Sequence, residues 1–194
     1  MDDAILVAKA AAGDQDAFTL LVERYRRYIY AIAYRIALHE DDALDIAQNV
    51  LLRLVERIGQ FDGRGPFRAW LAAVTAREAV SYRRRSQRRR EDLMAPEEMA
   101  AMADGRTADG RTATGGSHAP AAVAEALDGV RRREMVEAAM ADLSPQQRAI
   151  FALRFQEDMT PKEIAERIGL PAKQVRSQLC RAVARLKEMM AEKQ

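Results

Sequence analysis

One stretch, residues 61–90, limits the folds open to this chain more than any other. It reads FDGRGPFRAWLAAVTAREAVSYRRRSQRRR and opens with a glycine-rich loop over residues 62–66. Phe61 and Phe67 bound the loop, and Pro66 suits the first residue of a helix. The side chains that follow have the 3, 4 and 7 spacing of an amphipathic helix, which predicts a buried stripe made of Phe67, Trp70, Leu71 and Val74.

The same predicted helix becomes strongly basic beyond Val74. Arginine guanidinium groups hold phosphates, and aromatic rings stack on unpaired bases. A run of charge is often only a solvated surface, but here Trp70 anchors the helix to a core and gives its basic face a fixed direction. We therefore favour nucleic-acid binding by the polar residues of this segment, which are Arg77, Ser81, Tyr82, Arg83, Arg84, Arg85, Arg88, Arg89 and Arg90.

Composition favours helices and one or two domains. The chain has 194 residues, a net charge of only +2 and 6% aromatic residues, so the position of the charges matters more than their sum. A single cysteine excludes an intramolecular disulfide and a multi-cysteine zinc site. Acidic residues near the N-terminus do not suit a signal peptide, and no apolar run approaches the roughly 18 residues of a membrane span. We expect a cytoplasmic, all-α protein without membrane insertion.

Three helices are expected before residue 61. The first covers residues 4–12, and the second starts near Phe18 with Asp14 or Asp16 as its cap. The third covers about residues 41–58, with Asp41 or Asp42 as its cap. Its expected core stripe is Ala43, Ile46, Ala47, Val50, Leu54 and Ile58.

The third helix has a wider apolar arc than one core contact requires. Either a partner helix covers the excess, or the helix is sandwiched between two neighbours in its own domain. The residues concerned are Leu44, Leu51, Leu52 and Val55, beside the polar Asp45, Gln48 and Asn49.

Residues 91–130 have the composition of a linker. They contain a tandem Ala-Asp-Gly-Arg-Thr pentad and eight acidic residues against two arginines. No periodicity is sustained through this segment, which predicts a flexible, acidic connection.

A helix-turn-helix is expected in the C-terminal part. A helix is predicted over about residues 132–141, and Ser144 and Pro145 start the next one. Thr160-Pro161-Lys162-Glu163 combines a capping box with a first-turn proline, and Gly169 ends the short helix that follows. A second helix over 172–190 exposes Lys173, Gln174, Arg176, Ser177, Gln178 and Arg181, as in a helix-turn-helix, although an ordinary helical hairpin has a similar pattern.

No residues with the spacing of a catalytic site stand out. His39 and His118 are isolated, and the glycine-rich loop lacks the Lys-Ser/Thr of a nucleotide-binding loop. We predict no enzymatic activity, no catalytic residues, no metal and no cofactor.

Taken together, these motifs resemble the sigma factors of the sigma-70 family, in the compact extracytoplasmic-function (ECF) type. The resemblance rests on 42–48 (DALDIAQ), 61–65 (FDGRG), 67–71 (FRAWL), 143–148 (LSPQQR), 163–170 (EIAERIGL) and 175–177 (VRS). It implies an all-α fold of two small helical domains. Sigma region 2 would occupy residues 1–90, the linker 91–130, and the region 4 helix-turn-helix 131–194.

The resemblance also implies partners and sites. Core RNA polymerase would bind Leu44, Asp45, Gln48, Asn49 and Leu52. The melted −10 promoter element would meet Asp62, Gly63, Arg64, Arg77, Ser81, Tyr82, Arg84 and Arg85. The duplex −35 element would meet Lys173, Gln174, Arg176, Ser177 and Arg181.

Two further expectations accompany these sites. Relatives often carry Asn and Asp where this chain has Arg77 and Ser81, so the preferred −10 sequence is not carried over. Relatives are also commonly inhibited by an anti-sigma factor, which is a possible further partner. The alternative to a sigma factor is a dimeric helix-turn-helix transcriptional regulator that acts without docking on polymerase.

Overall fold

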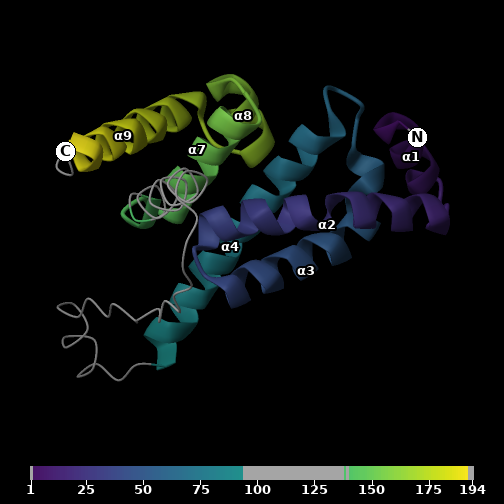
Figure 1. Ribbon diagram of the computed structural model, residues 1–194, viewed down its shortest axis with the longest axis horizontal. Coiled ribbons are helices and arrows are strands. Elements are labelled where there is room, and N and C mark those ends of the chain that lie inside the picture. Colours follow the sequence, from purple (N-terminus) through teal and green to yellow (C-terminus); the bar gives the residue numbers. More distant parts are fainter. Residues whose placement is uncertain (1, 94–137, 139, 192–194) are drawn as a thin grey trace, which may run out of the picture. The chain divides into compact units, whose positions relative to one another are not determined.

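The computed structural model describes residues 2–93, 138 and 140–191, and these residues form helices joined by short segments (Figure 1). The described part contains no β-strand, in agreement with the predicted all-α fold. None of its helices is long and apolar enough to cross a membrane. In chain order the elements are α1 (Asp3–Ala11), α2 (Gln15–Ala37), α3 (Glu40–Arg57), the 3-10 turn η1 (Ile58–Gln60), α4 (Phe67–Leu93), α7 (Pro145–Gln156), α8 (Pro161–Ile168) and α9 (Ala172–Ala191).

Helix α2 is capped at its N-terminus by Asp14, one of the two predicted candidates. The Asp14 carboxylate accepts a hydrogen bond from the backbone N–H of Ala17 at 3.0 Å, which satisfies an otherwise unpaired N–H of the first turn. Leu38 ends the helix in a left-handed conformation, with φ of 57°. The side chains buried along α2 are Ala17, Leu21, Tyr25, Ile29, Ile32, Ala33, Ile36 and Ala37.

Helix α3 begins differently from the prediction. His39 holds the N-cap position and makes no side-chain capping bond, so the expected cap by Asp41 or Asp42 is wrong. Both aspartates lie inside the first turn, where their charge favours the positive end of the helix dipole. The predicted core stripe of α3 is confirmed, since all of Ala43, Ile46, Ala47, Val50, Leu54 and Ile58 are buried.

Helix α4 starts one residue later than predicted. The carbonyl of Pro66 accepts from the backbone N–H groups of Ala69 and Trp70, so Pro66 precedes the helix instead of being its first residue. Phe67, Leu71 and Val74 are buried as expected, and Trp70 is half-buried. The buried arc is wider than the predicted stripe because it includes Ala69, Ala72, Ala73, Thr75, Ala76, Glu78 and Ala79.

Both predicted caps in the C-terminal part are present. Ser144 and Gln147 form a reciprocal capping box at the start of α7, and Thr160 and Glu163 form another at the start of α8. Gly169 ends α8 at a φ of 74°, a left-handed conformation that glycine adopts without a steric cost. The turn between α8 and α9 therefore follows directly from the sequence.

Residues 1–83 and 139–194 belong to one compact unit, and residues 84–138 to another. Within the first unit, one continuous set of buried side chains includes Leu71 of α4, Ile150 and Leu153 of α7, and Ile164 of α8. Arg148 is also buried, and its guanidinium donates to the carbonyls of Ile36 at 2.7 Å and Leu143 at 3.0 Å. Burial lowers the pKa of Arg148 to about 10, with a smaller contribution from the charge of Arg83.

Two predicted segments lie mainly outside the described residues. The predicted linker is described only over residues 91–93, which belong to the last turn of α4. The helix expected over about 132–141 is described only at 138 and 140–141.

The capping box of α8 predicts a pH dependence of stability. The backbone N–H and hydroxyl of Thr160 both donate to the Glu163 carboxylate at 2.7 Å, and these bonds lower the pKa of Glu163 below 4.5. Because the folded-state pKa is depressed, the stabilisation is fully present above the unfolded value and is lost as the pH falls through the folded value. Below about pH 4.5, urea midpoints of the wild type should therefore fall more steeply than those of Glu163→Gln. Parallel curves for the two proteins would contradict this role of Glu163.

Candidate nucleic-acid interface

The loop before α4 has a shape that its sequence dictates. The Asp62 carboxylate accepts from the backbone N–H of Arg64 at 2.9 Å, which closes a tight turn. Gly63 and Gly65 have φ values of 72° and 85°, a region in which side chains with a Cβ are strained. All residues from Asp62 to Pro66 are exposed. The loop is thus a preorganised, solvent-facing turn.

Packed aromatic rings hold the two ends of this loop. Phe61 and Phe67 meet edge to face with ring centroids 5.4 Å apart, and Phe67 stacks on Trp70 at 5.5 Å. Tyr25 of α2 contacts Phe67 from the other side at 5.4 Å. Aromatic pairs in these geometries add stabilisation beyond the area they bury. The loop is therefore fixed to the core of the compact unit at both ends.

A cavity of about 650 Å³ opens beside the loop, between the start of α4 and the α7–α8 segment. Arg167 of α8 closes one side, and its guanidinium donates to the carbonyl of Arg64 at 2.9 Å. The polar side chains around the cavity have both charges: Asp62, Arg64, Arg77, Glu157, Asp158, Glu163, Glu166 and Arg167.

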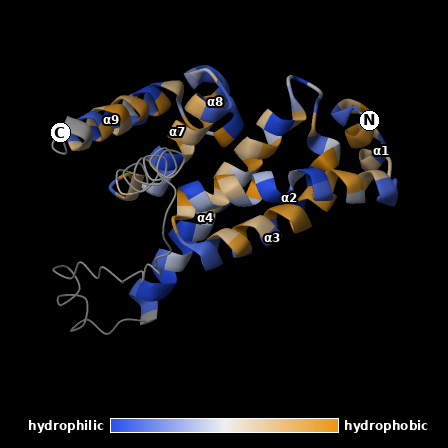
Figure 2. Cartoon of the chain, viewed as in Figure 1, coloured by the Kyte–Doolittle hydropathy of each residue, from blue (hydrophilic) through white to orange (hydrophobic). Residues whose placement is uncertain are grey.

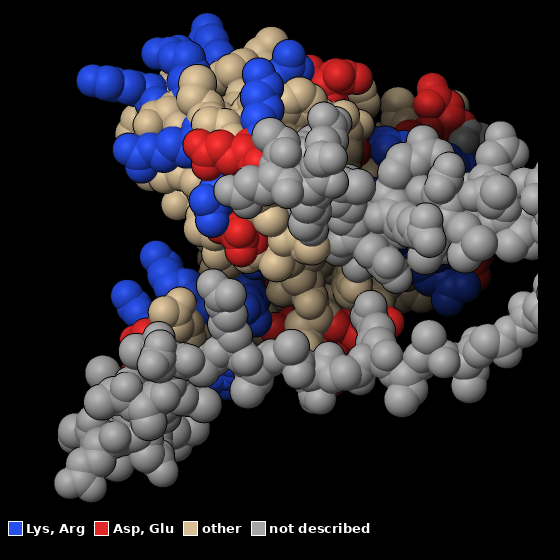
Figure 3. Space-filling model, turned by 60° about the vertical axis from the view of Figure 1, so that its left-hand side comes forward, with Lys and Arg blue, Asp and Glu red and all other residues tan. Residues whose placement is uncertain are grey.

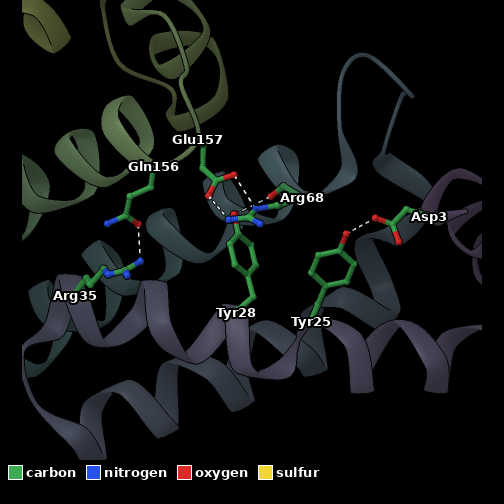
Figure 4. A network of polar contacts seen from close by, with 7 residues as sticks. All are labelled: Asp3, Tyr25, Tyr28, Arg35, Arg68, Gln156 and Glu157. Atoms are coloured by element: carbon green, nitrogen blue, oxygen red, sulfur yellow. Dashed lines mark hydrogen bonds and ion pairs between the residues drawn. The ribbon is translucent and has the colours of Figure 1, made fainter. Parts of the chain in front are cut away.

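A second polar network joins α2, α4 and the end of α7 (Figure 4). The Arg68 guanidinium lies 4.4 Å from the centre of the Tyr28 ring and forms an ion pair with Glu157 at 3.2 Å. Only 6% of the Glu157 side chain is exposed, so its partners must compensate the cost of burying this negative charge. Burial and the nearby Glu157 raise the pKa of Tyr28. Sequence patterns gave no signal for this network, because its members are far apart in the chain.

Side-chain contacts tie the distal polar residues of α4 to the start of α3. Tyr82 donates its hydroxyl proton to the Asp45 carboxylate at 2.8 Å, and Arg83 pairs with Asp42 at 2.7 Å. The hydrogen bond to Asp45 raises the pKa of Tyr82 to about 12. The structure therefore brings a residue predicted to bind the −10 element into contact with one predicted to bind polymerase.

Further residues predicted for the −10 element lie along the same helix. Arg77, Arg84 and Arg85 are exposed, and Ser81 is half-buried. Hydrophilic residues dominate the distal part of α4 in Figure 2.

The outer face of α3 is apolar and exposed, as the wide arc predicted. Leu44, Leu52 and Val55 are 58%, 64% and 61% exposed, whereas Leu51 is half-buried. Asp45 and Gln48 are exposed beside them, and Asn49 is half-buried. In the described part of the chain, no neighbouring helix covers these three side chains. The structure therefore favours the partner-helix interpretation over a helix sandwiched within its own fold.

Helix α9 carries on its exposed side the residues predicted to contact the −35 element. Val175 and Ala182 are buried on its inner side, which fixes the orientation of the helix. Lysine and arginine side chains stand out in the upper part of Figure 3, where α8 and α9 lie. The predicted contact residues are all exposed: Lys173, Gln174, Arg176, Ser177 and Arg181.

The described residues include no group of three or more His, Cys, Asp or Glu side chains that could hold a metal ion. His39 is exposed at the start of α3, and His118 lies outside the described residues. Cys180 is exposed on α9.

Two family models match the chain, one in each half. Residues 21–89 match the family model "Sigma-70 region 2", and residues 133–186 match "Sigma-70, region 4". The two matches together cover more than half of the chain, in the order of the sequence motifs. The chain belongs to the sigma-70 family of RNA polymerase sigma factors. Within that family it belongs to the ECF type.

Individual relatives share part of the sequence. The chain is 37% identical over 65 residues to the ECF sigma factor SigW of Bacillus subtilis, a match that covers 34% of this chain and 35% of SigW. It is 29% identical over 188 residues to the ECF sigma factor BldN of Streptomyces coelicolor, covering 96% of this chain and 65% of BldN. The matches thus span less than two thirds of these relatives' own length.

The fold is also similar to solved sigma factors. CnrH, solved in complex with the cytosolic domain of CnrY, superposes with a TM-score of 0.60 at 24% identity and covers 99% of both chains. RpoE of Bartonella quintana, solved with the anti-sigma factor NepR, gives a TM-score of 0.61 at 20% identity and covers 90% of this chain and 96% of RpoE. These likenesses establish the fold.

The contact between Tyr82 and Asp45 predicts an energetic coupling. Tyr82→Phe should lower the free energy of unfolding by about 0.5–1.5 kcal/mol, because it removes one hydrogen bond without changing the ring. The same substitution should have almost no effect when Asp45 is already alanine. A double-mutant cycle in urea measures the coupling. If the two single effects simply add, the bond contributes nothing to stability.

Proposed function

We propose that this protein is an alternative sigma factor that binds core RNA polymerase, recognises −35 and −10 promoter elements and promotes promoter melting. The observation that carries the proposal is the exposed apolar strip of Leu44, Leu52 and Val55 on α3. A regulator that only binds DNA has no need of it, whereas a subunit that docks on a larger enzyme does. The same chain also carries a base-binding loop and a helix-turn-helix.

Docking on polymerase is assigned to α3. The apolar strip has Asp45 and Gln48 on its polar edge, so a partner helix would meet an apolar centre and a polar rim. Leu44, Asp45, Gln48, Asn49 and Leu52 are the proposed contacts. Polymerase docking would compete with Tyr82 for the Asp45 carboxylate.

Binding of the melted −10 element is assigned to the loop and α4. The loop from Asp62 to Pro66 is exposed, fixed at both ends and rich in backbone groups that a flipped base can approach. Arginines along α4 supply positive charge for the strand that carries this base. The loop would contribute Asp62, Gly63 and Arg64, and the helix would contribute Arg77, Ser81, Tyr82, Arg84 and Arg85.

Recognition of the −35 element is assigned to α9. A recognition helix of a helix-turn-helix lies in the major groove and contacts base edges with residues near its N-terminus. Lys173, Gln174, Arg176 and Ser177 occupy the first two turns of α9, and Arg181 follows one turn later. An arginine there can form two hydrogen bonds with one guanine.

Promoter binding would require the compact unit to open. Arg167 of α8 contacts Arg64 of the loop, yet the two promoter elements are separated by roughly 25 base pairs, about 85 Å at 3.4 Å per step. These contacts cannot persist when both elements are bound. The chain between α4 and residue 138 is long enough to span this distance, since 44 residues reach about 145–160 Å when extended.

We propose region 2 over residues 1–90, an acidic linker over 91–130, and region 4 over 131–194.

The proposed partners are core RNA polymerase, promoter DNA and an anti-sigma factor. RpoE of Bartonella quintana was solved with the anti-sigma factor NepR, and we extend that kind of regulation to this chain. We assign the protein to the cytoplasm, where it would act without catalytic activity, metal or cofactor of its own.

The first test of this function concerns the apolar strip. Leu52→Glu should weaken binding to core polymerase at least tenfold, because it places a charge in the centre of an apolar contact. Leu20→Glu is a matched control, since Leu20 is an exposed leucine on the neighbouring helix α2. Affinity can be measured by fluorescence anisotropy of labelled protein with core enzyme, beside circular dichroism of both variants. Equal loss of affinity in the two variants, or no loss in either, would argue against docking through α3.

The second test separates the two DNA sites. Arg176→Ala should weaken binding of the holoenzyme to −35 duplex by about 1–3 kcal/mol if Arg176 contacts a base bidentately. Asp62→Ala should spare duplex binding and slow open-complex formation, because it removes the bond that shapes the loop. Duplex affinity and permanganate reactivity of unpaired thymines report the two steps separately. If Asp62→Ala impairs duplex binding alone, the loop does not bind unpaired bases.

A further inference from the structure

A small hollow lies between α3 and α4, and Arg77 lines both this hollow and the cavity beside the glycine-rich loop. Its volume is about 180 Å³, and Val50 and Val74 form its apolar lining. Its polar residues are three arginines, one glutamate and one serine: Arg53, Arg57, Arg77, Glu78 and Ser81. Two of these, Arg77 and Ser81, already belong to the proposed −10 surface. The resemblance to known sigma factors assigned no role to Arg53 or Arg57.

The charges around the hollow do not balance. Arg53 forms an ion pair with Glu78, whose side chain is only 3% exposed. Neither Arg57 nor Arg77 has an ion pair with any of the described residues. Three guanidinium groups therefore face one carboxylate, and the lining has an excess of two positive charges.

Arg57 and Arg77 are close enough to affect each other. Although Arg77 as a residue is exposed, partial desolvation of its guanidinium lowers its pKa, and repulsion from Arg57 lowers that pKa further. Two guanidinium groups on one hollow repel each other, and an anion between them would remove that repulsion. Ser81 adds a hydroxyl that can donate a hydrogen bond to the same anion.

The size and donor set restrict the ligand. Pockets for drug-sized molecules have volumes of about 300–1,000 Å³, so this hollow suits a single tetrahedral anion better than a whole nucleotide. Arginine groups bind phosphate oxygens through paired N–H donors, and Arg57 and Arg77 supply two guanidinium groups to the same hollow. The shared chemistry is therefore that of a phosphate group, either within DNA or free in solution.

We propose that the hollow lined by Arg57, Arg77 and Ser81 binds one backbone phosphate of promoter DNA at the −10 element. The inference rests on the proposed function, because α4 carries Arg77 and Ser81 on the surface assigned to that element. Arg57 then extends the DNA-binding surface from α4 onto α3. Arg53 is held by Glu78 at the edge of the hollow and adds no unpaired charge. The contact is independent of base sequence, since it involves only the backbone.

Salt dependence provides the sharpest test. Each phosphate contact contributes roughly 0.7–0.9 to the slope of log affinity against log salt. The holoenzyme carrying Arg57→Gln should bind a fluorescent −10 promoter fragment at least fivefold more weakly at low salt. The slope of its log affinity against log salt should be smaller in magnitude by roughly 0.7–0.9, the contribution of one phosphate contact. The loss should be the same for fragments with different −10 sequences. Arg57→Lys, which keeps the charge, should retain the slope.

Controls separate this inference from the proposed function. Arg27→Gln removes an exposed arginine of α2 and should bind as the wild type does. Circular dichroism and core affinity should be unchanged in all variants. If the wild type fails to bind core polymerase, the proposed function is wrong. If the wild type binds both core and promoter fragment while Arg57→Gln keeps the full slope, only the phosphate contact is wrong.

Inorganic phosphate distinguishes the two sources of the anion. On the DNA assignment, millimolar phosphate should raise the melting temperature of the wild type and of Arg57→Gln equally, through ionic strength alone. If phosphate stabilises only the wild type and the DNA slope is unchanged in Arg57→Gln, the hollow binds a free anion, and the assignment to promoter DNA is overturned.

Discussion

The buried face of α4 is the constraint on which every proposed site of the N-terminal part depends. Five alanines lie on this face, and their small side chains let the helix pack closely against its neighbours. Phe67 and Leu71 then fill the space at the start of the helix. With this face fixed, the glycine-rich loop at its beginning and the arginines at its end have defined directions. Removing a large side chain from the face would disturb the loop and the polar edge together.

The arginines of α3 and α4 differ in whether they form ion pairs. On α4, Arg68 is paired with Glu157 and Arg83 with Asp42, so these arginines serve the fold. Arg57 and Arg77 have no such partner among the described residues. The contacts of each arginine therefore separate those that hold the fold together from those proposed to bind phosphate.

Much of the fold was predictable because it rests on local rules. The capping boxes of α7 and α8, the glycine at the end of α8 and the core stripe of α3 follow from residue type and spacing. The start of α3 was mispredicted because three acidic residues in a row gave several possible caps, and His39 took the position without a side-chain bond. Local patterns predict that a helix forms more reliably than they predict the residue at which it begins.

The side-chain contacts that sequence reasoning missed are long-range. The bond between Tyr82 and Asp45 joins residues 37 positions apart, and the bond of Arg148 to Ile36 joins residues 112 apart. Periodicity cannot report such pairs, because both members look like ordinary polar positions. The hollow beside Arg57 was missed for the same reason, since α3 and α4 each contribute only part of it.

As a sigma factor, this chain would direct polymerase to promoters. Run-off transcription on a genomic promoter library, with core RNA polymerase with and without the protein, tests it most directly. The account predicts transcripts that start at defined sites and appear only when both components are present. Binding to duplex operators without core enzyme, together with no new transcript in the complete reaction, would contradict it and indicate a helix-turn-helix regulator instead.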